Sequence, residues 1–260
     1  VERLGYFQPN EVIFNTITPK GREDILNLEI QIKERSTGTV TLGAGYGSAK
    51  GFFLTGQVAE INLFGRGQTL SLQGQYSPDS FERSLNLGFT EPYFLDSRWS
   101  VGGDLFYIQF VIPGRFSSRK FGFDNRFGYP IVDEVDAYIT YKYEYLKLVR
   151  KEHPLVDVTP DLGLLSSVVW SVVRDKRNNR FETTDGNYQS AALETAGLGG
   201  DKYFLKYNLN NRFYRPIWGD LVFRNSTEFG QIFPTTARPV PSSEKFYIGG
   251  SSSLKGYEPF

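Results

Sequence analysis

One lysine near the end of the chain stands where a loop could use its charge. Leu254, Lys255, Gly256 and Tyr257 follow a run of glycine and serine, so a single cation lies between an aliphatic and an aromatic side chain. Gly256 permits a tight turn of the backbone. An ammonium group that is partly removed from water needs an anionic or polar partner. The motif indicates a loop that offers one cation for a function, and the alternative is a solvated loop cation.

A second segment could act through its backbone. Residues 38–47 alternate in polarity, with Val40, Leu42, Ala44 and Tyr46 on one face and Thr39, Thr41, Gly43, Gly45 and Gly47 on the other. Three glycines weaken the packing of a strand and raise the entropic cost of holding it extended. An edge strand with unmet N–H and C=O groups can template another strand. Alternatively, the glycines relieve crowding where the sheet bends.

Enzyme chemistry finds little support. The single histidine, His153, lies in a polar stretch between two expected strands, and the chain has no cysteine. We therefore expect no metal site and no disulfide scaffold. No serine sits in a nucleophile-elbow pattern, and no glycine-rich loop joins a strand to a helix to bind phosphate. The sequence predicts a protein that is not an enzyme, with no cofactor, metal or nucleotide.

The composition is neutral and mildly hydrophilic. The 260 residues carry 29 basic and 29 acidic side chains, and the mean hydropathy is −0.35. A zero net charge argues against nucleic-acid binding. The longest apolar stretch, 162–173, falls short of the roughly 18 residues of a spanning helix. A transmembrane barrel with a polar lumen has a mildly hydrophilic mean hydropathy of this kind, because every second residue of a strand faces the lumen. Because the chain has no methionine and no leader, we expect a fragment or a processed form.

Segments that alternate in polarity predict eleven strands. They are expected at 38–47, 52–61, 68–76, 82–91, 98–109, 119–129, 134–149, 162–174, 187–197, 202–215 and 220–232. Compact connections between strands are expected at one end of the barrel. On the other side, several are expected to be long, including 111–118, 150–161 and 233–260. Aromatic residues, 16% of the chain, fall at many strand ends and suit interfacial girdles. Tyr93, Phe94, Trp99, Tyr107, Tyr129, Tyr214, Trp218 and Tyr247 are the examples.

Strand length and parity decide between two all-β architectures. The alternative is a large soluble sandwich, but strands this long exceed the usual five or six residues of soluble sheets. We therefore expect an antiparallel transmembrane β-barrel over residues 37–260. Bacterial single-chain barrels have even strand numbers, so eleven strands predict an incomplete barrel.

Residues 1–36 predict a different unit. Val12, Phe14 and Ile17 precede a Pro-Lys-Gly turn, and alternating residues from Ile25 to Ile32 follow it. This indicates two strands of a small soluble module that ends near residue 36. A hairpin cannot bury a stable core alone. We therefore expect the module to begin upstream.

Several short motifs, in this order, resemble one family. They are Leu4 to Phe7 and Ile25 to Arg35, Thr37 to Tyr46, Asn62 to Gly67, Thr90 to Phe94, Arg174 to Asn178, and Leu254 to Tyr257. Together they resemble the superfamily of outer-membrane assembly and translocation proteins typified by BamA, the β-barrel assembly factor. The resemblance implies that residues 1–36 are the end of a periplasmic polypeptide-transport-associated (POTRA) module. It also implies a sixteen-stranded barrel whose remaining strands follow Phe260.

The same resemblance implies site roles. The first barrel strand, with Val40, Thr41, Leu42, Gly43, Ala44, Gly45 and Tyr46, corresponds to the lateral gate, where the first and last strands part toward lipid. Leu254, Lys255, Gly256 and Tyr257 correspond to the sixth-loop motif, whose cation reaches into the lumen. The family usually has arginine there. Lysine cannot make the two-pronged contact with a carboxylate that arginine makes. The contact that locks the loop in the lumen is therefore expected to be looser here, or to involve other partners.

The resemblance finally implies a function and partners. It implies an insertase of the Gram-negative outer membrane, with its N-terminal part in the periplasm, that hands strands of unfolded clients into the lipid bilayer. Accessory periplasmic lipoproteins are expected, and no nucleotide or nucleic acid. Two alternatives stay open: a two-partner-secretion or TamA-like translocation pore, and a passive diffusion porin.

Overall fold

The chain forms one large sheet and one small hairpin. The computed structural model describes residues 6–8, 12–17, 21, 26–47, 51–78, 82–112, 116–150, 161–180 and 182–246. Eleven antiparallel strands pair in sequence order, each with its neighbours along the chain. They are β3 Gly38–Gly47, β4 Gly51–Leu63, β5 Gln68–Ser77, β6 Glu82–Glu91, β7 Ser100–Ile112, β8 Phe116–Val132, β9 Val135–Arg150, β10 Asp161–Asp175, β11 Gly186–Ala196, β12 Phe204–Trp218 and β13 Leu221–Pro234. The expected all-β antiparallel class and the eleven barrel strands are confirmed.

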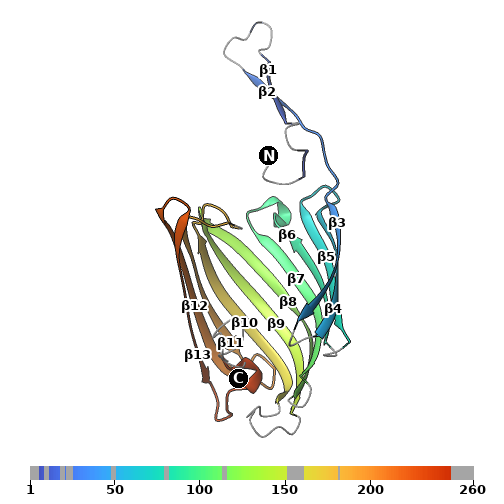
Figure 1. Cartoon of the computed structure of the whole chain (residues 1–260), viewed down its shortest axis with the longest axis vertical. Coiled ribbons are helices and arrows are strands. Elements are labelled where there is room, and N and C mark those ends of the chain that lie inside the picture. The colour runs from blue at the N-terminus through green and yellow to red at the C-terminus, as the bar shows by residue number, and fades with distance from the viewer. Residues whose placement is uncertain are drawn as a thin grey trace.

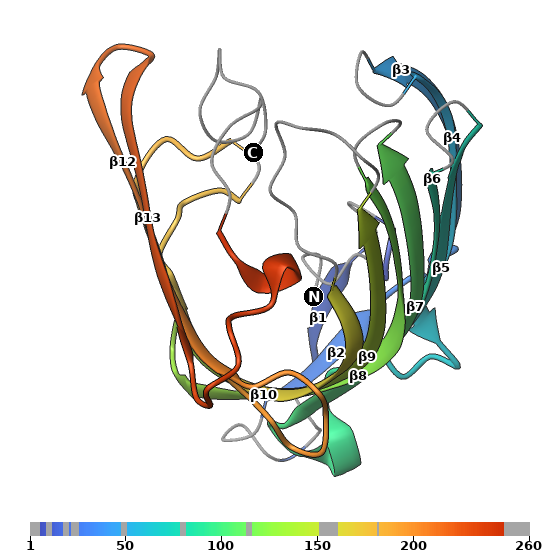
Figure 2. The ribbon, with the colours of Figure 1, turned by 90° about the horizontal axis from the view of Figure 1, so that it is seen from below.

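The sheet is strongly curved. Figure 1 shows the strands side by side as a tall wall, and Figure 2 shows that wall curling into a deep trough with β3 and β13 at its two margins. We call its inner surface the concave face and its outer surface the convex face. The near rim is the end where β3 begins, and the far rim is the end where β13 ends. No helix among the described residues is long and apolar enough to cross a membrane.

Alternation along each strand gives the two faces opposite chemistry. On the convex face, Leu72, Leu87 and Leu105 are neighbours across three strands, and all three are exposed. On the concave face, Asp104 and Asp124 face each other, and Arg126 pairs with both. This is the inside-out distribution of a barrel whose outer wall meets lipid and whose lumen is polar.

Turn lengths differ in part from expectation. The predicted long connection at 111–118 is wrong, because β7 extends to Ile112 and β8 begins at Phe116. On the near rim the connection 92–99 contains the short 3-10 helix η2, Phe94–Asp96. The connection 176–185 is also longer than a tight turn. Asn178 organises it, since its Oδ1 accepts the N–H groups of Thr184 and Asp185, both at 3.2 Å.

Of the eight aromatic residues expected in two interfacial girdles, six belong to the near-rim ends or connections of the strands, Tyr107 lies toward the far rim, and Tyr247 lies outside the described residues. The Trp99 and Tyr129 rings lie 4.9 Å apart, while Tyr93 and Trp218 are 62% and 85% exposed. Tyr214, predicted for the same girdle, is instead 5% exposed. It shares the concave face with Arg224, whose guanidinium lies 5.5 Å from the Tyr214 ring centre. Side chains alternate between the two faces along β12, and the position of Tyr214 in this alternation places it on the concave face. The girdle interpretation considered only its place near the strand end.

The N-terminal residues form the predicted pair of strands. β1 Ile13–Ile17 pairs with β2 Asn27–Gln31 in an antiparallel hairpin. The hairpin stands beyond the near rim, apart from the wall (Figure 1). Its apolar side chains are exposed, including Phe14 at 58% and Leu28 at 56%. An exposed apolar surface of this kind fits one part of a larger module. The assignment of residues 1–36 to a POTRA module stays a prediction.

Candidate functional site

The first strand of the wall has one free edge. β3 pairs with β4 along its whole length, from Gly38 opposite Glu60 to Gly47 opposite Gly51. No described strand pairs with its other edge. Val40, Leu42 and Tyr46 project from the convex face with 71%, 82% and 79% of their surface exposed. Among the described residues, the outer edge of β3 is therefore unpaired, and it lies beside an apolar surface.

Among the contacts of the described residues, polar side chains fasten β3 at its beginning. The Thr37 hydroxyl donates to the Glu60 carboxylate, and the Thr39 hydroxyl donates to the Ala59 carbonyl at 3.4 Å. From Val40 to Gly45 the strand carries hydrocarbon side chains or none, apart from Thr41. The backbone ladder to β4 supplies the attachment there. Fewer side-chain contacts mean a lower free energy of local opening.

Two of the predicted gate glycines have a packing role. On the concave face, the Phe53 ring of β4 covers Gly45 so closely that an added Cβ would lie 2.5 Å from Phe53 Cζ. At Gly43 an added Cβ would lie 2.8 Å from Thr55 Oγ1. These contacts support the crowding interpretation, in which glycine makes room for a neighbouring side chain. The contacts do not bear on strand templating by β3, which stays a prediction.

The lumen holds a chain segment. After β13, residues 235–246 turn back from the far rim and enter the trough, where the short 3-10 helix η3, Ser242–Glu244, lies against the concave face (Figure 2). Arg238 donates to the carbonyl of Asp201 at 3.2 Å and places its guanidinium 5.7 Å from the Tyr203 ring centre. We call residues 235–246 the luminal segment.

A buried ion pair holds the luminal segment. Lys202, between β11 and β12, is 3% exposed, and its Nζ lies 3.0 Å from Oδ2 of Asp161, the first residue of β10. Lys202 also donates to the Ser243 hydroxyl at 3.1 Å, and the hydroxyl donates to Asp161. Buried charges persist when they are paired and hydrogen-bonded. Three groups from distant parts of the sequence thus satisfy one another.

A second set of contacts lies deeper in the trough. Lys206 Nζ lies 3.4 Å from Glu244 Oε2 and 5.1 Å from the centre of the Phe246 ring. That ring covers Gly230, where a Cβ would collide with it. Beside it, Leu165, Ala196 and Phe204 form a small buried apolar cluster that Ile232 joins. The luminal segment is therefore held by charge, by hydrogen bonds and by apolar contact.

The rest of the concave face is a network of paired charges. Lys120 lies 2.7 Å from Glu144, and Lys142 lies 3.4 Å from Glu194. Ser167 donates to Glu194 at 2.7 Å. The carboxylates are nearly buried and each has a cation, so the network stiffens the wall and leaves a polar surface that water can wet.

The predicted sites lie in different positions relative to these contacts. Leu254, Lys255, Gly256 and Tyr257 lie outside the described residues, as does His153. The expected luminal ion pair of Lys255 stays a prediction, although the described start of the same loop does enter the lumen. The sequence did not single out Asp161, Lys202 or Ser243. No group of three or more candidate metal-binding side chains occurs among the described residues.

The Arg174 to Asn178 turn carries a further charge contact. Arg177 Nε donates to Asp175 at 2.8 Å, and Arg177 lies over the Tyr188 ring at 5.0 Å. The hydrogen bond to Asp175 raises the pKa of the Arg177 guanidinium above its already high value. The cation is permanently charged and closes the near rim between β10 and β11.

Comparison with known proteins gives a consistent result. Residues 62–260 match the family described as the Omp85 superfamily domain. The chain is 30% identical over 268 residues to the outer membrane protein assembly factor BamA of Nitratidesulfovibrio vulgaris, covering 98% of this chain and 33% of that protein. It is 26% identical over 265 residues to the sorting and assembly machinery component 50 homolog A of Xenopus laevis, covering 98% and 55%.

A solved structure agrees in fold. The crystal structure of BamA from Haemophilus ducreyi lacking POTRA domains 1-3 superposes with a TM-score of 0.79 at 22% identity, covering 99% of this chain and 52% of that one. The chain spans about a third of the length of its BamA relative from N. vulgaris, at 33%. The expected BamA-like barrel region is confirmed at the level of fold and family.

Proposed function

Because this chain belongs to the Omp85 superfamily, we propose that its protein assembles β-barrel proteins into the outer membrane of a Gram-negative bacterium. A relative named as an outer membrane protein assembly factor, at 30% identity, and a relative named as a sorting and assembly machinery component, at 26%, support the proposal. The Xenopus relative is an animal protein, so the bacterial membrane is part of the proposal. In the same proposal the residues of 1–36 lie in the periplasm.

The free edge of β3 carries the mechanistic part of the proposal. An extended client strand can add to such an edge through main-chain hydrogen bonds, which give affinity without requiring a particular sequence. The edge lies beside the exposed side chains of Val40, Leu42 and Tyr46, so a client strand added there would place its own apolar face toward lipid. Residues 40–46 act in this account as a lateral gate that templates the first client strand.

The energy for assembly comes from the client. Each strand that leaves water buries apolar surface in lipid and satisfies its backbone hydrogen bonds, which the hydrocarbon region makes obligatory. Transfer from the β3 edge to the client's own next strand exchanges one set of backbone bonds for another. The proposal therefore requires no nucleotide. Its partners are unfolded outer-membrane clients, the lipid bilayer and accessory periplasmic lipoproteins.

Reconstitution tests the proposed activity. The full-length protein is placed in liposomes and an unfolded client barrel is added, with folding followed by the heat-sensitive mobility of the client in gels. We expect client folding to be at least about tenfold faster than in empty liposomes, which corresponds to a barrier lowered by about 1.4 kcal/mol. Equal rates in both kinds of liposome would refute the insertase.

The polar lumen favours a second candidate, a translocation pore. Its charged network and the buried side-chain amide oxygens of Asn208 and Asn210, which have no partner in the structure, suit a water-filled interior. The luminal segment opposes free diffusion, because it fills part of the trough (Figure 2). Planar-bilayer conductance separates the candidates. A large steady open state without faster client folding favours a diffusion pore, and client passage across the bilayer favours the translocator.

A further inference from the structure

Three cations lie in one row across the convex face. In register across adjacent strands, Arg83 of β6 faces Gln109 of β7, Gln109 faces Arg119 of β8, and Arg119 faces Lys147 of β9. All three cations are exposed, and they lie near the far rim. The row contains no acidic residue. With strands about 4.8 Å apart, Arg83 and Lys147 are separated by about 14 Å.

Two of these cations repel each other. Arg119 and Lys147 are directly opposite across β8 and β9, where like charges destabilise a sheet. Neither has an acidic partner among the described residues, whereas cations of the concave face such as Lys120 and Lys142 are paired. Arg83 contacts only the Tyr76 ring, 5.5 Å from its centre, among the contacts that the structure records. An anion between Arg119 and Lys147 would offset their repulsion.

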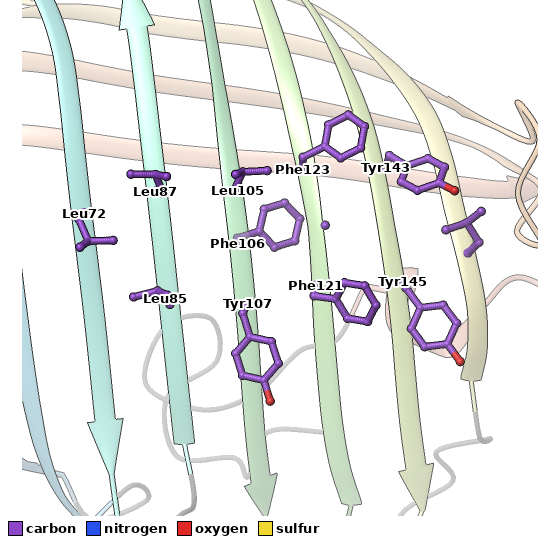
Figure 3. A pocket seen from close by; sticks show the side chains of 12 residues that line it. Leu72, Leu85, Leu87, Leu105, Phe106, Tyr107, Phe121, Phe123, Tyr143 and Tyr145 are labelled. Carbon is purple, nitrogen blue, oxygen red and sulfur yellow. The ribbon is translucent and has the colours of Figure 1, made fainter.

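An apolar hollow begins two residues along the strands from the row of cations, on the side away from the far rim. Two residues farther along the same strands, Leu85, Tyr107, Phe121 and Tyr145 line a depression of about 730 Å³ on the convex face (Figure 3). The step along a strand is about 7 Å. The Phe121 and Tyr145 rings lie 5.4 Å apart, and the Tyr107 hydroxyl donates to Gln109 at 2.7 Å, which links the hollow to the polar row.

The combination of cations above and hydrocarbon below matches one kind of ligand. On a wall that spans a membrane, the cationic row lies at the headgroup level and the hollow lies at the level of acyl chains. The row is too wide for one phosphate group, and the hollow reaches from Leu72 of β5 to Leu164 of β10. Arginine and lysine bind phosphate oxygens through charge-assisted hydrogen bonds.

We propose that this surface binds a lipid of the leaflet at the far rim that carries two phosphate groups and several acyl chains, which is the chemistry of lipid A. Arg119 and Lys147 share one phosphate and Arg83 contacts the other. The acyl chains lie in the hollow against Phe121 and Tyr145. The site rests on the membrane location of the proposed function, but it does not depend on client assembly.

Lipid binding to the full-length protein in detergent tests the site. Native mass spectrometry and thermal unfolding are measured with bisphosphorylated hexa-acyl lipid A, monophosphorylated lipid A, phosphatidylglycerol and phosphatidylethanolamine. We expect occupancy by bisphosphorylated lipid A to fall at least about tenfold in Arg119→Gln/Lys147→Gln, because two charge-assisted contacts are lost. Arg215→Gln, an exposed cation on the near-rim end of β12, is the matched control and should bind as wild type does.

Thermal unfolding separates a loss of lipid binding from a loss of protein stability. Without lipid, the double variant should be at least as stable as wild type, because the repulsion between Arg119 and Lys147 is gone. Lipid A should raise the unfolding temperature of wild type and leave that of the double variant unchanged. Equal lipid A binding by both proteins, or equal wild-type binding of phosphatidylglycerol and bisphosphorylated lipid A, overturns the proposal. Client folding in liposomes without lipid A reports on the insertase alone, so the two proposals fail separately.

Discussion

Burial distinguishes two ion pairs of nearly equal length. Lys202 and Asp161 lie 3.0 Å apart with side chains 3% and 10% exposed, whereas Lys176 and Glu134 lie 2.9 Å apart with side chains 44% and 46% exposed. A buried charge that loses its partner keeps its desolvation cost, while an exposed charge returns to water. The first pair therefore matters for the position of the luminal segment, and the second does not.

We predict that Lys202→Met lowers the free energy of unfolding by about 3 kcal/mol, because it leaves the Asp161 carboxylate buried without a cation. Lys176→Met, at the exposed pair, should change that free energy by less than about 1 kcal/mol. Urea unfolding in detergent micelles measures both. Equal effects of the two variants would contradict the role given to burial.

Gly45 offers a second test at the residue scale. Its missing Cβ leaves room for the Phe53 ring, so Gly45→Ala should lower the free energy of unfolding by about 1 to 3 kcal/mol through overpacking. Gly56→Ala on β4 is the control, because its new Cβ would lie 3.5 Å from Leu42 Cδ2, an ordinary contact. Gly45→Ala combined with Phe53→Ala should lose less than the sum of the two single changes. Strict additivity would remove the packing role of Gly45.

The luminal ion pair that the family resemblance implies for Lys255 stays a prediction. Lys255→Ala should reduce client folding in liposomes and lower the unfolding temperature, because the expected luminal ion pair is lost. Lys255→Arg should be tolerated, since the charge is kept and arginine is the residue usual in the family. Wild-type behaviour from both variants would show that Lys255 is only a solvated loop cation.

At the scale of elements, the luminal segment and β3 are attached in different ways. The segment is fixed by side chains from the far-rim connection and from β10 and β12, which include Lys202, Asp161 and Lys206. β3 is fixed by its backbone ladder to β4 and by few polar side chains. The structure therefore combines a partly filled lumen with a margin strand that is held mainly by backbone hydrogen bonds.

We predict that Ser243→Asp releases the luminal segment, because two buried carboxylates, Asp161 and the new one, would then share the single cation of Lys202. Conductance of the full-length protein in planar bilayers should rise. Thr235→Asp is the control, since Thr235 is exposed at the beginning of the segment. Unchanged conductance in Ser243→Asp would mean that the segment does not restrict the pore.

At the scale of the whole molecule, the alternation of polarity predicted more than any motif did. It located all eleven strands of the wall, with β3 and β6 at the predicted bounds. Period two is a direct consequence of strand geometry, so a sheet with an apolar and a polar face records it in every strand. Connections record no such period, which is why the long loop expected at 111–118 was wrong.

The luminal contacts could not be predicted for a different reason. Asp161 and Ser243 are 82 residues apart, and nothing in the local sequence of either residue specifies the other. Their meeting depends on the curvature of the sheet and on the return of the segment into the trough. The strand β3 was easier to predict, because its glycines and its place as the first strand of the wall are visible in the sequence. The Phe53 ring and the Thr55 hydroxyl that lie against Gly45 and Gly43 are not.

The most direct test of the account is disulfide trapping at the edge of β3. The 260 residues contain no cysteine, so Leu42→Cys or Ala44→Cys gives this region one defined thiol. Leu87→Cys, exposed on the convex face in the middle of the wall, is the control. A stalled client with one cysteine in its terminal strand should form an adduct at 42 or 44 and not at 87. An equal adduct at 87, or none at β3 in a protein that still folds clients, would contradict strand templating at this edge.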